Sequence, residues 1–196
     1  MKKALNFSGL SAAVIASIVC LFVIGYLYYR SQEVKLAERR NLILNVVIEE
    51  QVRLSQFLKL AKSEKVKLLE GLKNEPEITG LLNQLVDEED IKQSILDQVG
   101  KSRDLQMQAI ALSDLIISDV EDDLLGNNQL IGTLTNNGDG IDQVSLNNVE
   151  AAISESKAHS DIMINSFNLS LESVSEAKNA EKEAEAVLKT ILNSNE

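Results

Sequence analysis

Residues 10–29 read LSAAVIASIVCLFVIGYLYY and contain no charged side chain. They form the centre of a longer uncharged run, Ala4–Tyr29, which lies between Lys3 and Arg30. An α-helix needs about 20 consecutive apolar residues to cross the hydrocarbon core of a bilayer. Because every backbone polar group in lipid must be paired within the segment, such a span has to be helical. The sequence therefore predicts a transmembrane anchor over residues 10–29.

Two alternative interpretations of this stretch are less well supported. A cleaved signal peptide would have a shorter apolar region and a small-residue cleavage site before the polar part. Cys20 suggests a lipoprotein, but Val19 precedes it where a small residue is needed, and apolar sequence continues for nine residues beyond it. Basic residues flank both ends almost equally. The two lysines before the apolar run favour an amino end inside the cell.

The chain beyond the anchor is acidic and poor in aromatic residues. Residues 41–196 hold 28 of the 30 acidic and 13 of the 19 basic residues, a balance of 13 − 28 = −15. Such a surface repels phosphate backbones, so nucleic acid is not expected as a partner. Aromatic residues make up 4% of the chain and there is one proline, which favours long helices over a sandwich or barrel. The single cysteine, Cys20, excludes an intramolecular disulfide framework.

A first long helix is predicted over residues 30–73, continuous with the anchor. Its apolar residues recur at steps of three, four or seven and form two stripes. One stripe contains Val34, Ala37, Leu44, Ile48, Val52, Leu58 and Ala61, and the other contains Ile43, Val47, Leu54, Phe57, Leu68 and Leu72. Two stripes predict a wide apolar face, as expected for a helix buried in a bundle.

Two further helices are predicted, over residues 77–125 and 145–193. Pro76 ends the first helix and suits the first turn of the next. The third helix is expected to be capped by Ser145, and its heptad positions are often Ser or Ala, which predicts thin packing. Between these helices, residues 126–143 hold four glycines and four asparagines and are predicted to form a loop.

These elements predict an all-α fold: an N-terminal single-pass transmembrane helix that continues into an elongated antiparallel bundle of three long helices. The domain organisation is a short N-terminal tail at residues 1–9, the anchor at 10–29 and the bundle at 30–196. A hairpin at Pro76 would place the basic stretch Lys59–Lys73 opposite the acidic residues Asp87–Asp90, with matching charge signs.

The sequence predicts no catalytic, cofactor-binding or metal-binding residues, and no enzyme. It lacks the phosphate-loop, dinucleotide-binding and nucleophile-elbow motifs, and it has too few ligands for zinc. Residues 139–142, DGID, resemble part of a calcium loop. With Gly140 at the turn position, however, Leu146 occupies the place of the closing Glu. The single histidine, His159, is expected to face solvent from a helix.

We therefore expect a membrane-anchored helical scaffold or protein-interaction module that is not catalytic. The expected location is the bacterial inner membrane, with the bundle on the periplasmic side. Protein partners are expected, and a homo-oligomer is an open alternative because the apolar stripes could be satisfied within one chain or between two.

The predicted architecture also resembles two families. It is similar to the ligand-binding half of bacterial chemoreceptors and histidine-kinase sensors, which implies a sensory bundle. Because residues 31–196 contain no second apolar span, such a sensor would act through a separate transducer. The combination of an anchor and a helical periplasmic part also resembles the inner-membrane spanins of phages, which implies an envelope protein.

Overall fold

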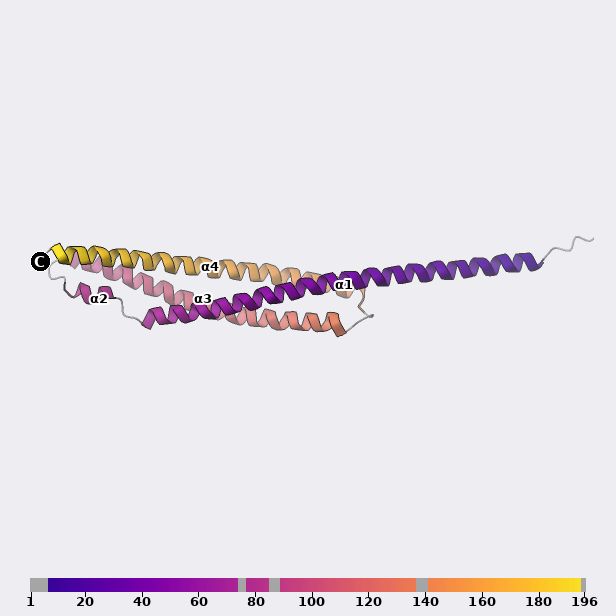
Figure 1. Ribbon diagram of the computed structural model, residues 1–196, viewed down its shortest axis with the longest axis horizontal. Coiled ribbons are helices and arrows are strands. Elements are labelled where there is room, and N and C mark those ends of the chain that lie inside the picture. Colours follow the sequence, from indigo (N-terminus) through magenta and orange to yellow (C-terminus); the bar gives the residue numbers. More distant parts are fainter. Residues whose placement is uncertain (1–6, 74–76, 85–88, 137–140, 195–196) are drawn as a thin grey trace, which may run out of the picture.

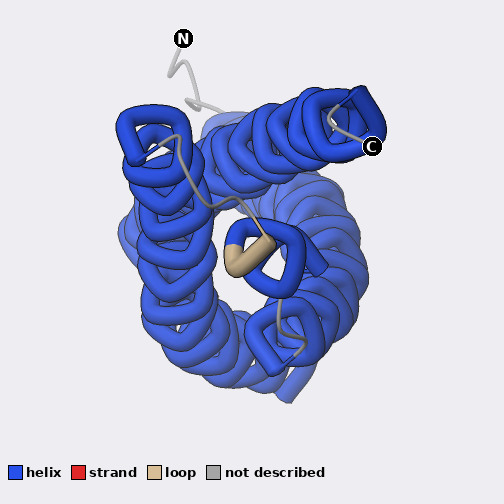
Figure 2. The backbone as a smooth tube through the Cα atoms, turned by 90° about the vertical axis from the view of Figure 1, so that its left-hand side faces the viewer, coloured by secondary structure: helices blue, strands red, loops and turns tan. Residues whose placement is uncertain are grey.

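The computed structural model shows an elongated helical molecule (Figure 1). It describes residues 7–73, 77–84, 89–136 and 141–194, and the side chains from Ala16 onward except those of Glu77 and Ser194. The helices are α1 (Phe7–Lys73), α2 (Glu77–Leu82), α3 (Glu89–Asn136) and α4 (Gln143–Ser194). Viewed end-on, the described part of the chain is helical and contains no strand (Figure 2).

Helices α1, α3 and α4 form an elongated three-helix bundle, which confirms the predicted all-α, antiparallel architecture. Lys62 on α1 pairs with Glu121 on α3, with 2.6 Å between Nζ and Oε1. Nearer the start of α1, Gln51 donates to the side chain of Asn128 at 2.7 Å. Since α3 numbers rise as α1 numbers fall, these two helices are antiparallel. Helix α4 returns alongside α1, and its end lies far from the projecting part of α1 (Figure 1).

Helix α2 takes the place of α1 at the far end of the bundle. Its Ile78 and Leu82 are almost fully buried with Leu188 of α4 and residues of the first part of α3. The start of α3 therefore lies beyond the end of α1. This corrects the predicted charge register, because Lys65 pairs with Asp114, far beyond the start of α3. Of the predicted partners Asp87–Asp90, the first two lie outside the described residues.

The core follows the second predicted α1 stripe, together with Ala61 of the first. Leu54 and Phe57 pack with Val120 of α3 and Phe167 of α4 in the central cluster. The Phe57 and Phe167 rings meet edge to face, with centroids 5.6 Å apart and planes at 85°, a favourable arrangement of two ring quadrupoles. The expectation that both α1 stripes are buried is wrong, because Ile48 and other members of the first stripe are exposed.

The predicted loop over residues 126–143 is largely helical. Helix α3 continues through Gly126 and Gly132 to Asn136, and neither glycine has a positive φ. Leu134 is 1% exposed in a cluster with Val47 and Leu146. Its burial outweighs the cost of about 1 kcal/mol that a helical glycine carries relative to alanine.

The start of α4 also differs from the prediction. Asp142, and not Ser145, is the N-cap, because its Oδ1 accepts a 2.7 Å hydrogen bond from the backbone N–H of Ser145. An Asp side chain in this position satisfies one of the free amide groups at a helix start.

Within the described residues, no helix is both long enough and apolar enough to span a membrane. The predicted anchor over residues 10–29 is therefore not confirmed. Residues 10–15 of that prediction lie outside the residues whose side chains are described.

Candidate functional site: a polar layer in the bundle

A layer of polar residues interrupts the apolar core between two of its clusters, nearer the end at which α1 leaves the bundle. The cluster around Val47 and Leu146 lies on one side of it, and the cluster around Leu54 and Phe167 lies on the other. All three long helices contribute to the layer: Glu50 and Arg53 from α1, Asp123 and Asn127 from α3, and Ser156, His159, Ser160 and Asp161 from α4.

Glu50 is the centre of the α1–α4 half of the layer. Its side chain is 5% exposed. Arg53 donates two hydrogen bonds to this carboxylate, from Nε to Oε2 at 2.8 Å and from Nη2 to Oε1 at 2.6 Å. The hydroxyl of Ser160 donates to the same Oε1 at 2.8 Å. Burying a carboxylate is costly unless it is paired and hydrogen-bonded, and here both conditions are met.

Arg53 also bonds to residues of α4. Its guanidinium bonds to Asp161 as well as to Ser160. The carboxylates of Glu50 and Asp161 raise the pKa of Arg53, with the Glu50 hydrogen bond as the largest cause. The group therefore stays charged, and its planar fork fixes α4 against α1 at one register.

Asp123 and His159 form the α3–α4 half of the layer. Their Oδ2 and Nδ1 atoms are 3.6 Å apart, and the histidine side chain is 52% exposed. Burial raises the pKa of Asp123, while His159 acts in the opposite direction. Asn127 is 2% exposed. Its Nδ2 has no hydrogen-bond partner among the described residues.

Sequence reasoning missed this layer, although a signal was present. Glu50 lies on the buried α1 stripe, between Val47 and Leu54, at steps of three and four residues. The prediction that His159 faces solvent is consistent with its exposure. The prediction did not include the neighbouring Asp123, because that contact depends on the register of α3 against α4.

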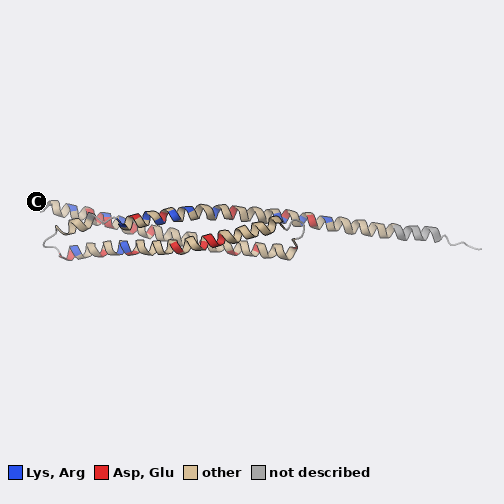
Figure 3. Cartoon of the chain, turned by 90° about the horizontal axis from the view of Figure 1, so that it is seen from below, with Lys and Arg blue, Asp and Glu red and all other residues tan. Residues whose placement is uncertain are grey.

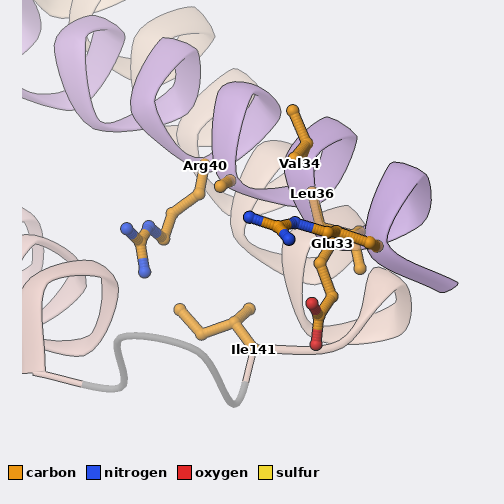
Figure 4. A pocket seen from close by; sticks show the side chains of 7 residues that line it. Glu33, Val34, Leu36, Arg40 and Ile141 are labelled. Carbon is orange, nitrogen blue, oxygen red and sulfur yellow. The ribbon is translucent and has the colours of Figure 1, made fainter. Parts of the chain in front are cut away.

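A second candidate site is a surface pocket of about 330 Å³ where α1 leaves the bundle. Figure 4 shows it with its lining residues Arg30, Glu33, Val34, Leu36, Ala37, Arg40 and Ile141. Ile141 comes from the start of the α4 segment and faces α1 (Figure 4). Charges of both signs line an apolar floor, so the pocket has no single preference for anions or cations.

The described residues contain no group of three or more side chains suited to hold a metal ion. Of the residues that resemble a calcium loop, Asp139 and Gly140 lie outside the described residues. Asp142 is described and caps α4.

The polar layer can therefore fix the helices in one alignment. Its charged groups bond to each other across helices and do not converge on a described cavity.

Comparison with protein-family models, with curated proteins and with solved structures found no match for this chain.

Proposed function

We propose that the chain is a non-catalytic, membrane-anchored helical scaffold that presents its bundle to protein partners. The anchor is the uncharged stretch at residues 10–29. Its setting would be a bacterial inner membrane with the bundle on the periplasmic side.

The observation that carries the anchor is the projecting part of α1. From Ile18 to Tyr29 ten large apolar or aromatic side chains are each between 48% and 75% exposed. In Figure 3 the projecting helix is uncharged between its grey end and the first charged residues next to the bundle. A helix that is apolar on all sides belongs in a protein core or in lipid. Tyr26, Tyr28 and Tyr29 lie at the end nearer the bundle, where aromatic side chains favour the headgroup region.

The polar layer supports the scaffold part of the proposal. Glu50, Arg53 and Ser160 are engaged with each other, which leaves their hydrogen-bonding groups committed to holding helices together. A rod whose internal charges fix its own alignment is suited to presenting surfaces at a set distance from its anchor.

Vesicle flotation of the full chain tests the anchor. The wild-type chain should float with phospholipid vesicles and resist extraction at alkaline pH. The double substitution Val19→Asp and Val23→Asp should abolish flotation, because each charge at the centre of a bilayer costs about 2.5–3.5 kcal/mol.

A matched control uses the same change elsewhere on α1. Val46 and Val66 are 44% and 52% exposed, close to the 54% and 50% of Val19 and Val23. Val46→Asp with Val66→Asp should float like wild type. The proposal is refuted if wild type stays with the unbound protein, or if both double variants float equally well.

A further inference from the structure

An exposed strip of α1 holds seven uncharged residues and is bordered by the exposed acidic residues Glu38 and Glu49. We call it the outer stripe, and it consists of Val34, Ala37, Asn41, Asn45, Ile48, Val52 and Ser55. All seven side chains are exposed, and they recur at steps of three and four residues. They therefore share one face of the helix over a length of about 32 Å.

The outer stripe combines exposed apolar side chains with uncharged polar ones. Ile48 and Val52 are 42% and 51% exposed, beside a shallow surface groove of about 370 Å³. Lys59 lies one turn after the stripe and Arg30 one turn before it. Exposed apolar surface with few charges is typical of the centre of a protein interface.

We infer that the outer stripe is the contact face between two copies of this chain that lie parallel to each other. The parallel direction rests on the proposed function, since two chains anchored in one membrane must leave it in the same direction. Symmetry then brings each residue near its own copy.

The outer stripe is compatible with such self-contact. Valine and isoleucine pack against themselves, and the amide groups of Asn41 and Asn45 can each donate to and accept from the same amide in the other chain. Each chain has a net charge of −11, so two copies repel one another over most of their surface. An uncharged stripe is the face on which they can approach at the least electrostatic cost.

The contact is also continuous with the projecting helix. Cys20 is exposed and lies 14 residues before Val34, so it falls close to the same face of α1. Pairing of the bundle segments and of the projecting segments would reinforce each other, because linking two weak contacts raises the effective concentration of each.

Disulfide cross-linking of the full chain in vesicles tests the inference. Cys20→Ser removes the native thiol, and one cysteine is then introduced at Ile48 or at Val52. Oxidation should give a covalent dimer of twice the chain mass, since facing positions in a parallel pair bring Cα atoms within disulfide reach.

Val46 provides the matched control. It is 44% exposed against 42% for Ile48, but it lies two residues away and so points about 160° from it around the helix. Val46→Cys should cross-link at least about tenfold less than Ile48→Cys. Equal cross-linking at the two positions, or none at either, would overturn the inference.

A second variant separates this inference from the proposed function. Ile48→Glu should abolish the Val52→Cys cross-link without changing vesicle flotation, and circular dichroism should stay helical. Flotation without any cross-link would overturn the parallel pair and leave the anchor intact. Cross-linking at Ile48 without flotation would refute the anchor and support the contact face.

Discussion

The hydroxyl of Ser160 on α4 donates a 2.8 Å hydrogen bond to the carboxylate of Glu50 on α1, inside the core of the bundle. The two residues are 110 positions apart in the sequence. Since Arg53 bonds to both, this contact fixes how far α4 is displaced along α1.

Removing Arg53 should destabilise the bundle because it leaves the buried Glu50 carboxylate without its cation. We expect Arg53→Met to lower the free energy of unfolding by about 2 kcal/mol, less than for a fully buried pair because Arg53 is 35% exposed. Adding Glu50→Met should restore much of that loss, since an apolar pair needs no counter-charge. Urea unfolding followed by circular dichroism measures both.

The exposed pair Lys67–Glu64 is the control for Arg53. Lys67→Met should change the free energy of unfolding by less than about 0.5 kcal/mol. A double variant at Glu50 and Arg53 that is less stable than Arg53→Met alone would contradict the assignment.

The sequence predicts the helices better than their register. The spacing of Val47, Leu54 and Phe57 is enough to place them on a buried face, as the structure confirms. Their partners depend on how α3 is aligned against α1, which the spacing within α1 does not determine. The segment predicted as a helix over residues 77–125 is divided, because α2 packs on α4 as a separate helix and α3 begins at Glu89.

The sequence also did not predict that α3 continues beyond Leu125. Local composition there favours a loop, because glycine and asparagine are poor helix formers. What overrides it is the burial of Leu134 against Val47 of α1 and Leu146 of α4. The same limit explains why Val34, Ile48 and Val52 were expected to be buried although they are exposed. Periodicity shows that residues share an apolar face but does not identify what covers that face.

Replacing Gly126 with alanine tests the extended α3. The helix continues through Gly126, and a Cβ added there meets no atom within 4 Å. Gly126→Ala should therefore stabilise the protein by about 0.5–1 kcal/mol, a rise of roughly 1–4 °C in melting temperature. In a loop the substitution would bring no gain in helix propensity, so an unchanged or lower melting temperature would contradict the helix.

Gly71 is the matched control, because it is also helical but crowded. A Cβ there would lie 2.8 Å from Nζ of Lys178 and 3.0 Å from Oε1 of Gln106. Gln106 is 3% exposed and has little room to move. Gly71→Ala should stabilise the protein less than Gly126→Ala does.

Asp123 should make stability depend on pH. Burial raises its pKa above 3.8, so the folded state binds its proton more tightly than the unfolded chain does. Stability is therefore lost as the pH rises from 3.8 through the pKa of the folded state. Asp123→Asn should remove this loss and melt above wild type at pH 7, with a smaller difference at pH 3.

Asp119→Asn provides the comparison for Asp123, since it removes the same charge from an exposed position one turn earlier on α3. Thermal melts from pH 3 to pH 7 compare the melting temperatures of both variants with that of wild type. If Asp119→Asn raises the melting temperature at pH 7 as much as Asp123→Asn does, the effect comes from the change in net charge and not from the burial of Asp123.

Asp142 should give the opposite pH dependence. Hydrogen bonds from the side chain and backbone of Ser145 lower its pKa below 3.8. A lowered pKa means that the ionised cap contributes stability above pH 3.8, and that this contribution is lost as the pH falls toward the pKa of the folded state. Asp142→Ala should lower the melting temperature at pH 7, because the Ser145 N–H loses its acceptor.

Asp142→Asn separates the cap from the charge. It keeps an acceptor at the start of α4 but cannot ionise, so it should melt between wild type and Asp142→Ala at pH 7. As the pH falls below 3.8 its deficit relative to wild type should shrink. Asp104→Asn, a change at an exposed position within α3, should show no such convergence. If Asp142→Ala melts at the same temperature as wild type at pH 7, α4 does not depend on the Asp142 cap. Ser145, the cap predicted from the sequence, would then be the alternative N-cap.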